Sequence, residues 1–497
     1  MPSVIDLHGW CYHAHHLTIK DCFPRRRSPT RYLASVPFDG ELWGTRLRVT
    51  PHVMPQRLLC HCVIGSTLND ESSFSHVTNR FFFLQDEDGE FRPAYNKANQ
   101  ALPFSPPFAH PDAASEKNLQ AFRDFLCQSH PHLATEFQNN ALLKLSDKMY
   151  TDTESRHTLL RAHRQIMRLR QMDHFLMNAQ RQGRISFYMT CTGEEGIHMG
   201  AASALDPNDP ILAQYREQGL LMWRGFSLEQ FTNQCFSNDR DVGRGRQMPV
   251  HYGSKALQYH TVSSPLGTQL PQAVGVAYRL KLAKQPNVPV CFFGDGAAST
   301  TDFHSAMNFA ATLKAPVLFF CRNNGYAIST PVTDQYAGDG IVSRAPGYGM
   351  AGIRVDGNDI FAVHAAVREA RSYALKKQAP VLIEAMTYRL GHHSTSDDST
   401  RYRSADEVED YKSHMDPLAR LEKFLIKHGL LTPEAVARVE EDERFAVRKA
   451  MQEAEKRPKP PLDLLFEDVY HELPASLESQ KKALKEHIAK YPQKYSH

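Results

Sequence analysis

The chain has 497 residues, of which 41% are hydrophobic and 23% are charged, a balance that is typical of globular proteins. Its 58 basic and 55 acidic residues leave a formal net charge of +3, which excludes both the broad basic excess of a nucleic-acid-binding protein and the acidic bias of a disordered chain. Apolar stretches such as Ala315–Cys321 are too short to span a bilayer. We therefore expect a soluble protein with neither nucleic-acid nor membrane partners.

Residues 1–57 contain more basic than acidic side chains, and no compact apolar run precedes a small-residue cleavage site. This pattern is typical of an organelle transit segment rather than a secretory signal, and a basic leader without a targeting role is the alternative. The 9 cysteines of the chain include no CxxC pair. They indicate a reducing compartment rather than a disulfide framework.

Residues 58–150 form an N-terminal extension, in which residues 101–140 are rich in Pro, His and Ala. We interpret that stretch as an insertion or linker. A regular pattern begins after the polar residues Thr151–Glu154, where apolar side chains recur at helical spacing. These side chains are Leu159, Leu160, Ile166, Met167, Met172, Phe175, Leu176 and Ala179. They predict a long amphipathic helix at the start of a domain that spans residues 151–404.

Strand and helix patterns alternate between residues 288 and 330. The apolar runs Val288–Phe293 and Val317–Cys321 are typical of buried strands, and the apolar residues between them recur at helical spacing. A βαβ unit of this kind implies a parallel sheet with helices on both faces and with ligands at the carboxyl ends of its strands. The predicted fold class is therefore α/β.

A second helical pattern, Ile360–Lys377, leads into the apolar run Val381–Ala385, and a pair of histidines, His392 and His393, follows that predicted strand. Residues 405–497 are charged and helical, with apolar side chains in the stretch 462–469 that would suit contact with a neighbouring subunit. We expect a helical C-terminal region there.

Two of the predicted strands end in polar residues that suit a metal and an anion. Gly294-Asp295-Gly296 follows the first strand, and Asn323-Asn324 follows the next. A carboxylate with amide and carbonyl oxygens suits Mg²⁺, which completes its coordination with phosphate oxygens, and a helix starting after Gly296 would direct amide groups at an anion. A plain tight turn is the alternative for the triplet alone, and a Rossmann site is disfavoured because Ser299 replaces its third glycine. The combination predicts a magnesium diphosphate site.

These strand ends resemble the fingerprint of thiamine diphosphate enzymes, and the stretches around them are similar to the alpha subunits of the decarboxylating component of 2-oxo acid dehydrogenase complexes. Within that family, Tyr388–Asp398 most closely resembles the branched-chain members and not the pyruvate members. The resemblance extends over Thr158–Pro474 and implies the thiamine diphosphate-binding fold. Further matching blocks are Gly183–Thr190, Gln214–Glu217, Gly243–Gly253 and Ser263–Gln272.

The resemblance implies an activity and its partners. Such an enzyme decarboxylates branched-chain 2-oxo acids oxidatively and transfers the acyl group to the lipoyl group of a transacylase in the mitochondrial matrix, so residues 1–57 would be a mitochondrial transit segment. Thiamine chemistry needs a glutamate that protonates the cofactor, and the family takes it from a beta subunit. We therefore expect an alpha2beta2 heterotetramer that is inactive without beta, with the transacylase core and a regulatory kinase and phosphatase as further partners. A pyruvate dehydrogenase alpha subunit is the alternative.

The resemblance also implies site residues, position by position. The side chains of Asp295 and Asn324 and the carbonyl of Tyr326 would hold magnesium. Arg216 and Arg322 would face the diphosphate, whereas either arginine alone would be interpreted as part of a surface ion pair. The other residues implied at the cofactor are Gln214, Tyr215, Ser264, Leu266, Gly296, Ala297, Ala327, Ile328 and His393. Leu266 would be the wedge that holds the cofactor bent, and ordinary core packing is the alternative for it.

A monovalent cation, potassium, is implied next to the cofactor. Its ligands would be Ser263, Thr268, Gln269 and the carbonyl of Leu266. Without the resemblance, hydroxyl and amide side chains this close together are interpreted as turn residues that bond to their own backbone.

His393 is the predicted catalytic residue, because a histidine can donate to a phosphate or move a proton near neutral pH. In the family, the matching residue supports acyl transfer to the lipoyl group. The adjacent His392 is predicted to be structural, and His251 is left unassigned.

Ser394 and Ser404 match the family's inhibitory phosphorylation positions. A phosphate beside a diphosphate and its arginines would disorder the loop or repel an acidic partner. The residues expected to anchor this loop are Arg389, Asp397, Tyr402 and Arg403.

Two other classes of function stay open on the sequence. One is a nicotinamide dehydrogenase, which the incomplete glycine pattern disfavours. The other is a non-catalytic subunit with the same fold, which the presence of a full set of implied site residues disfavours. Those residues are Arg216, Asp295, Arg322, Asn324 and His393.

Overall fold

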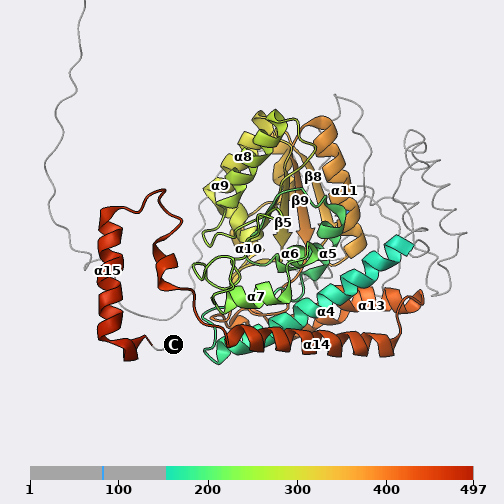
Figure 1. Cartoon of the computed structure of the whole chain (residues 1–497). Coiled ribbons are helices and arrows are strands. Elements are labelled where there is room, and N and C mark those ends of the chain that lie inside the picture. The colour runs from blue at the N-terminus through green and yellow to red at the C-terminus, as the bar shows by residue number, and fades with distance from the viewer. Residues whose placement is uncertain (1–80, 83–152, 496–497) are drawn as a thin grey trace, which may run out of the picture. The chain divides into compact units, whose positions relative to one another are not determined.

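The computed structural model describes residues 81–82 and 153–495. The predictions made for the leader 1–57 and for the insertion 101–140 fall outside these described residues. A central parallel sheet organises the described part of the chain (Figure 1).

The sheet has seven strands, and every pairing between them is parallel. In sheet order the strands are β1 (Phe81–Phe82), β8 (Ala351–Asp356), β9 (Val381–Met386), β5 (Leu318–Asn323), β4 (Val290–Gly294), β2 (Ile211–Leu212) and β3 (Tyr259–His260). The predicted α/β class is confirmed, and the carboxyl ends of all these strands share one edge. The strands β1, β2, β3 and β8 were not expected from the sequence pattern.

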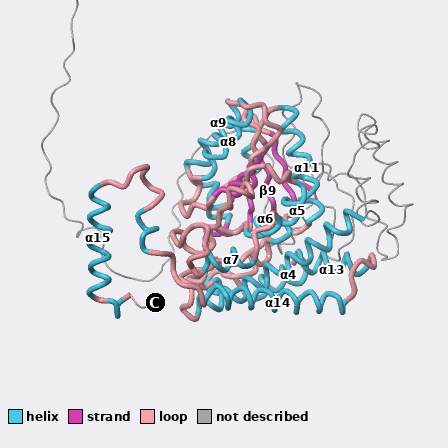
Figure 2. The backbone as a smooth tube through the Cα atoms, viewed as in Figure 1, coloured by secondary structure: helices cyan, strands magenta, loops and turns pink. Residues whose placement is uncertain are grey.

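Helices cover both faces of the sheet because successive strand residues alternate between the faces. Phe293 and Phe319 face a core that includes α8 and α9, whereas Phe292 and Phe320 face the core on the other side, which includes α5 and α11. Figures 1 and 2 show α8 and α9 on one side of the strands and α11 on the other. The helices named here are α5 (Glu195–Ala204), α8 (Gln269–Leu282), α9 (Thr301–Thr312) and α11 (Ile360–Lys377).

A layer of helices packs outside α5 and α11. The long amphipathic helix predicted at the domain start is α4, which buries six of the eight expected apolar side chains, whereas Leu160 and Phe175 are only half-buried. It packs against α13 and α14 of the C-terminal region, and α14 also packs against α7, so the prediction of a helical C-terminal region is confirmed. The elements introduced here are α4 (Thr153–Arg181), α7 (Leu228–Cys235), α12 (Ala405–His414), α13 (Pro417–Lys427), α14 (Pro433–Glu455) and α15 (Ala475–Lys490).

Short elements complete the carboxyl edge of the sheet and the C-terminal region. They are α6 (Gln218–Trp223), α10 (Val332–Gln335), the hairpin strands β6 (Tyr326–Ala327) and β7 (Thr330–Pro331), and the 3-10 helices η3 (Asp295–Ser299), η4 (Val342–Tyr348), η5 (Ser399–Arg401), η6 (Leu462–Phe466) and η7 (Pro492–Lys494). None of the described helices is both long and apolar enough to cross a membrane.

The prediction that an α-helix starts directly after Gly296 is wrong. The chain forms the 3-10 helix η3 at this point, and the extended backbone of Thr300 separates it from α9. The amide groups nearest the strand end therefore belong to a 3-10 turn, and the N-terminus of α9 lies further along the chain. The predicted anion site cannot depend on that helix N-terminus alone.

Candidate active site

The predicted metal residues emerge at the carboxyl edge of the sheet from the neighbouring strands β4 and β5. Gly294 pairs with Arg322 in the strand register, so Asp295 and Asn324 follow the ends of neighbouring strands, one and two residues beyond this pair, and both are buried. Asp295 accepts a hydrogen bond of 2.8 Å from the amide of Gln335. Burial raises the pKa of Asp295 even though this bond opposes the shift. Within the part of the chain that the structure describes, no cation forms an ion pair with Asp295, and a buried carboxylate of this kind suits a metal ion.

Gly296 allows the β6–β7 hairpin to pack directly over the strand end. A Cβ atom at this position would lie 2.8 Å from the Cβ atom of Ala327, closer than real side chains approach. Ile328, the next residue of the hairpin, has a φ angle of 57°, which is unfavourable for a β-branched side chain. Gly296, Ala327 and Ile328 thus meet at the predicted cofactor site, and Ala297 is buried beneath them.

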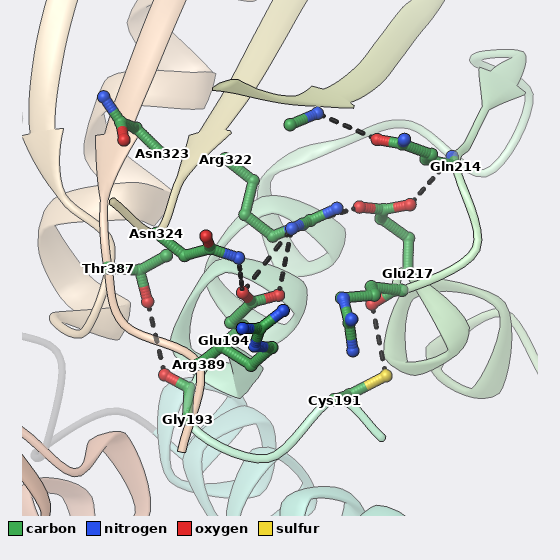
Figure 3. Close-up of polar contacts among 12 residues, drawn as sticks. Cys191, Gly193, Glu194, Gln214, Glu217, Arg322, Asn323, Asn324, Thr387 and Arg389 are labelled. Carbon is green, nitrogen blue, oxygen red and sulfur yellow. Dashed lines mark hydrogen bonds and ion pairs between the residues drawn. The ribbon is translucent and has the colours of Figure 1, made fainter. Parts of the chain in front are cut away.

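Arg322 is buried between two buried glutamates, Glu194 and Glu217 (Figure 3). Its Nε atom donates to Glu217 Oε1 at 2.9 Å, and one terminal nitrogen lies 3.2 Å from Glu194 Oε2. Burial lowers the pKa of Arg322, but the two carboxylates outweigh it and the pKa is raised. The alternative of a surface ion pair is wrong, because this arginine is the cation of an interior network.

Two further buried arginines, Arg216 and Arg389, converge on His393. Arg216 donates to the carbonyl of Thr190 at 2.5 Å and to Nδ1 of His393 at 3.2 Å, and Arg389 donates to the same nitrogen at 3.0 Å. Within the described residues, neither guanidinium lies within ion-pair distance of a carboxylate. Burial, followed by the charge of Arg216, lowers the pKa of Arg389. Unneutralised positive charge in a buried site attracts an anion.

His393 is held as a neutral imidazole with a defined tautomer. Because Nδ1 accepts from both Arg216 and Arg389, the ring proton must reside on Nε2. Burial and these two arginines lower the pKa of His393 to about 3. Its backbone N–H donates to Asp397 at 2.7 Å, and Tyr215 contacts the ring edge-on with centroids 6.0 Å apart. The ring can therefore donate from Nε2 at neutral pH.

Gln214 ties the loop after β2 to the strand end of β4. Its side-chain oxygen accepts from the N–H of Gly294 at 2.8 Å, and its own N–H donates to Glu217 Oε2 at 2.8 Å. Figure 3 shows Gln214 and Glu217 on the same side of Arg322. Hydrogen bonds between side chains and backbone N–H groups thus hold Gln214 beside Gly294, the residue before Asp295.

A separate set of predicted site residues lies before and at the start of α8. The set predicted to hold potassium is Ser263, Leu266, Thr268 and Gln269. Thr268 Oγ1 contacts the carbonyl of Pro265 at 3.4 Å, and the Gln269 amide donates to the carbonyl of Phe292 at 3.0 Å. Leu266 is 41% exposed, so ordinary core packing does not explain it. Within the described residues no group of three or more His, Cys, Asp or Glu side chains could hold a metal ion. The predicted magnesium site therefore needs amide and carbonyl oxygens besides Asp295, and the predicted potassium site consists of hydroxyl, amide and carbonyl oxygens.

His251, left unassigned from the sequence, bonds directly to Ser264. Its Nε2 atom lies 2.5 Å from Ser264 Oγ, and Nδ1 lies 3.0 Å from the carbonyl of Pro249. Since a carbonyl only accepts, Nδ1 carries the proton and Nε2 accepts from the serine. Val250 has a φ angle of 67°, so the two β-branched residues with positive φ in the described chain are Val250, next to His251, and the predicted cofactor residue Ile328. Such strain concentrates at functional sites.

The loop between β9 and α12 is held by a small set of polar contacts. Asp397 accepts from the hydroxyl of Tyr402 at 2.5 Å, and Arg389 donates to the same hydroxyl at 3.0 Å. Arg403 donates to the carbonyl of Gly391 at 2.8 Å and to that of Arg389. The four residues expected to anchor this loop do lie together.

The two serines of the loop differ in exposure. Ser394 is buried, whereas Ser404 is exposed and caps α12 by accepting from the N–H of Glu407 at 3.1 Å. His392 bonds to Ser399 at 2.9 Å within the loop, an arrangement that suits a structural residue. A modifying enzyme could reach Ser404 without rearrangement but not Ser394.

Sequence reasoning missed Glu194, Glu217 and Gln335. Glu217 belongs to a block that matched the family, but its residue type alone does not distinguish a buried carboxylate from a solvated one. The available signal for Glu194 was the pair Glu194-Glu195 between glycines in an otherwise apolar stretch. Gln335 follows a hairpin that no periodicity predicts.

A parallel α/β sheet with a carboxylate, an asparagine and buried arginines at adjacent strand ends defines an enzyme that binds an anionic cofactor at the carboxyl edge. The chain belongs to the dehydrogenase E1 component family, whose model matches residues 163–463. The resemblance found in the sequence is confirmed, and membership of this family implies thiamine diphosphate as the cofactor and a beta subunit as a partner.

Curated relatives agree over most of their length. The chain is 53% identical over 337 residues to the mitochondrial 2-oxoisovalerate dehydrogenase subunit alpha of Homo sapiens, covering 68% of this chain and 76% of that protein. It is 53% identical over 336 residues to the subunit alpha 1 of Arabidopsis thaliana (68% and 71% covered). It is 52% identical over 357 residues to the Caenorhabditis elegans subunit (72% and 83% covered).

Proposed function

We propose that this chain is the alpha subunit of a mitochondrial branched-chain 2-oxo acid dehydrogenase, which decarboxylates its substrate and passes the acyl group to the lipoyl group of a transacylase. The names of its relatives support the substrate class, because 2-oxoisovalerate is a branched-chain 2-oxo acid, and they favour this function over the pyruvate alternative. The most direct structural support is the convergence of Arg216 and Arg389, both buried and without carboxylate partners in the described part of the chain, on neutral His393.

The residues at the carboxyl edge fit magnesium and thiamine diphosphate. Asp295, Asn324 and the carbonyl of Tyr326 supply the oxygen ligands that Mg²⁺ prefers, and Arg216 supplies donors for phosphate oxygens. When bound, thiamine diphosphate supplies a thiazolium ring that accepts electrons during decarboxylation. His393 would donate its Nε2 proton to the cofactor, and the exposed apolar side chains of Leu266 and Ile328 would contact it. The potassium site at Ser263, Leu266, Thr268 and Gln269 is part of this proposal.

Several finer proposals depend on this function. The beta subunit would complete an alpha2beta2 heterotetramer and contribute the glutamate that this chain lacks in a matching motif. Ser394 and Ser404 would be targets of a regulatory kinase and phosphatase. The proposed domain division is a leader at 1–57, an extension at 58–150, the cofactor domain at 151–404 and a helical region at 405–497.

The testing experiment co-expresses the chain with its beta subunit and compares decarboxylation of pyruvate and 3-methyl-2-oxobutanoate by the complex. We expect turnover of the branched substrate by the complex and none by the alpha chain alone. Preferential turnover of pyruvate would replace the substrate assignment, and robust turnover by the alpha chain alone would refute the split site.

The metal proposal has its own test. Asp295→Ala should abolish magnesium-dependent binding of thiamine diphosphate to the complex, as measured by calorimetry, because it removes the carboxylate ligand. The exposed Asp334, next to Gln335 in α10, provides the matched control, and Asp334→Ala should bind as the unmodified complex does. Equal affinities for all three proteins would refute the site.

A further inference from the structure

Glu194 is a buried carboxylate to which the proposed function gives no role. It is fully buried at the N-cap position of α5, yet its side chain does not cap that helix. Glu217 is likewise the N-cap residue of α6 and likewise leaves its helix uncapped. Both side chains point at Arg322 instead (Figure 3). Glu194 and Glu217 therefore contact Arg322 and leave the N-termini of α5 and α6 without a side-chain cap.

The turn before Glu194 fixes where its side chain lies. Gly193 has a φ angle of 101°, and a Cβ atom there would lie 2.3 Å from the carbonyl oxygen of Tyr388. Its carbonyl accepts from Thr387 at 3.2 Å, as Figure 3 also shows. The turn is therefore pressed against the end of β9, and Glu194 enters the carboxyl edge from a fixed position.

Glu194 determines which way the amide of Asn324 faces. The Nδ2 group of Asn324 donates to Glu194 Oε1 at 2.6 Å, and Oδ1 accepts from the N–H of Tyr326 at 3.2 Å. An amide donates only from nitrogen and accepts only at oxygen, and Mg²⁺ binds only oxygen here. With nitrogen turned to Glu194, the oxygen is the atom left for a metal.

A charged residue is needed at this position because two donors meet it. The carboxylate faces Asn324 through Oε1 and Arg322 through both oxygens, at 3.2 and 3.5 Å. Burial alone would raise the pKa of Glu194, but Arg322 and Arg216 outweigh it and the pKa is lowered. A glutamine has one acceptor oxygen in place of two, and its other terminal atom is a donor. With its oxygen on Arg322, its NH₂ group would face Asn324 and favour the flipped amide, which presents nitrogen to the metal.

We propose that Glu194 is a positioning residue, which orients the Asn324 amide for the metal and holds Arg322 beside it. This inference rests on the proposed function, since it requires a metal at Asn324. It adds to that function a carboxylate that acts through the metal ligand Asn324.

The neighbouring residue supplies the matched control. Glu195 is equally buried, but it pairs with Arg170 at 2.7 Å and accepts from the N–H of Gly193 at 2.9 Å, away from Asn324. Each variant is assembled with the beta subunit, and Mn²⁺, which accepts the same oxygen ligands, is titrated by electron paramagnetic resonance in the presence of thiamine diphosphate. Glu194→Gln should weaken Mn²⁺ binding by about tenfold or more, the loss of a charged hydrogen bond, whereas Glu195→Gln should not.

A second pair of variants separates orientation from general damage. In Asn324→Asp, both side-chain oxygens can bind a metal, so orientation no longer matters. Adding Glu194→Gln to Asn324→Asp should therefore cause no further loss of Mn²⁺ affinity, and a donor at position 194 should even favour the aspartate. If Glu194→Gln caused equal losses with and without Asn324→Asp, Glu194 would only support the fold.

The outcomes also separate this inference from the function on which it rests. If the unmodified complex binds no Mn²⁺ with thiamine diphosphate, the proposed function is wrong. If that complex binds and Glu194→Gln binds equally well, the function stands and the positioning role is wrong. Circular dichroism melts of all variants identify any complex that has failed to fold, and the comparison of Asn324→Asp with and without Glu194→Gln then decides the question.

Discussion

Glu194 and Glu195 are adjacent, equally buried, and members of two different charge networks. Glu195 belongs to the helical layer, where Arg170 bonds both of its oxygens and also both oxygens of Asp416. This network joins α4, α5 and the N-terminus of α13. Glu194 belongs to the carboxyl edge of the sheet, where Arg216 and Arg389 have no carboxylate partner within the described residues.

The difference shows how to distinguish a structural network from a site. In the helical layer every carboxylate oxygen of Glu195 and Asp416 meets an arginine nitrogen, so nothing is left for a ligand to satisfy. At the carboxyl edge two guanidinium groups meet one neutral imidazole, an arrangement that costs free energy until an anion arrives. Burial of charge is common to both regions, and only the second is left incomplete.

The largest effect on stability is expected in the network of Arg170, Glu195 and Asp416, which we call the closed network because all four carboxylate oxygens are bonded. Arg170→Met would leave Glu195 and Asp416 as uncompensated buried charges, which costs about 3–5 kcal/mol. Urea unfolding of the complex, followed by circular dichroism, measures the loss. If the variant lost less than about 1 kcal/mol, as a surface pair would, the helical layer would not be the structural network described here.

At Arg216, Arg389 and His393, which we call the open network, a substitution is expected to affect cofactor binding more than stability. Arg216→Met should weaken binding of thiamine diphosphate by about 1.5–3 kcal/mol, the value of a hydrogen bond to a charged group, because a phosphate donor is lost. Stability without the cofactor should fall less than in Arg170→Met, since repulsion from Arg389 is relieved. Calorimetry and urea unfolding of the same preparations test both statements. A variant that unfolded easily yet bound the cofactor normally would reverse the comparison.

The sequence was sufficient where local pattern and spacing determine structure. The helix α11 has the bounds that periodicity predicted, and β4 and β5 lie within two residues of their predicted apolar runs. The spacing of Asp295 and Asn324 predicted that both residues follow neighbouring strands at one edge of the sheet, because parallel strand ends meet there. These predictions require only the regular geometry of helices and strands.

The remainder depends on contacts between distant parts of the chain. Nothing local distinguishes Glu194 from Glu195. Glu194 bonds to Asn324, 130 residues away, whereas Glu195 bonds to Arg170, which is 25 residues from it and 246 residues from its other partner, Asp416. The start of α9 was misplaced because the 3-10 turn at Asp295 is a response to packing under the hairpin, not a sequence preference. Leu266 is exposed although its residue type favours burial, because exposure is determined by the tertiary fold and not by residue type alone.

The buried Ser394 and the exposed Ser404 allow the effect of a new charge to be compared inside and outside the open network. Ser394→Glu would place a charge in a buried position beside the open network, and we expect lipoyl-domain acylation to fall by about tenfold, or about 1.4 kcal/mol. Ser404→Asp should have a smaller effect, because aspartate is itself a good N-cap residue and a negative charge is favourable at the N-terminus of α12. Acylation of a lipoyl domain by each complex provides the measurement. Equal inhibition by both variants would mean that burial of Ser394 has no bearing on its effect.

The smallest effect concerns the pH dependence of stability, and it follows from the same unpaired arginines. The pKa of His393 is lowered to about 3 by burial, Arg216 and Arg389, whereas an unfolded histidine titrates near 6.5. Between these values the unfolded chain binds the additional proton, so His393 costs nothing above about pH 6.5 and destabilises the fold as the pH falls below it. His393→Gln should therefore lose less thermal stability than the unmodified complex between pH 7 and pH 5, by a small margin because the ring is partly exposed.

Thermal melts at several pH values, without and with magnesium and thiamine diphosphate, test this prediction. A bound diphosphate would neutralise Arg216 and Arg389, so the difference in pH dependence between His393→Gln and the unmodified complex should narrow when the cofactor is present. If melting temperature changed with pH in the same way in both proteins without cofactor, the two arginines would not act on the His393 ring.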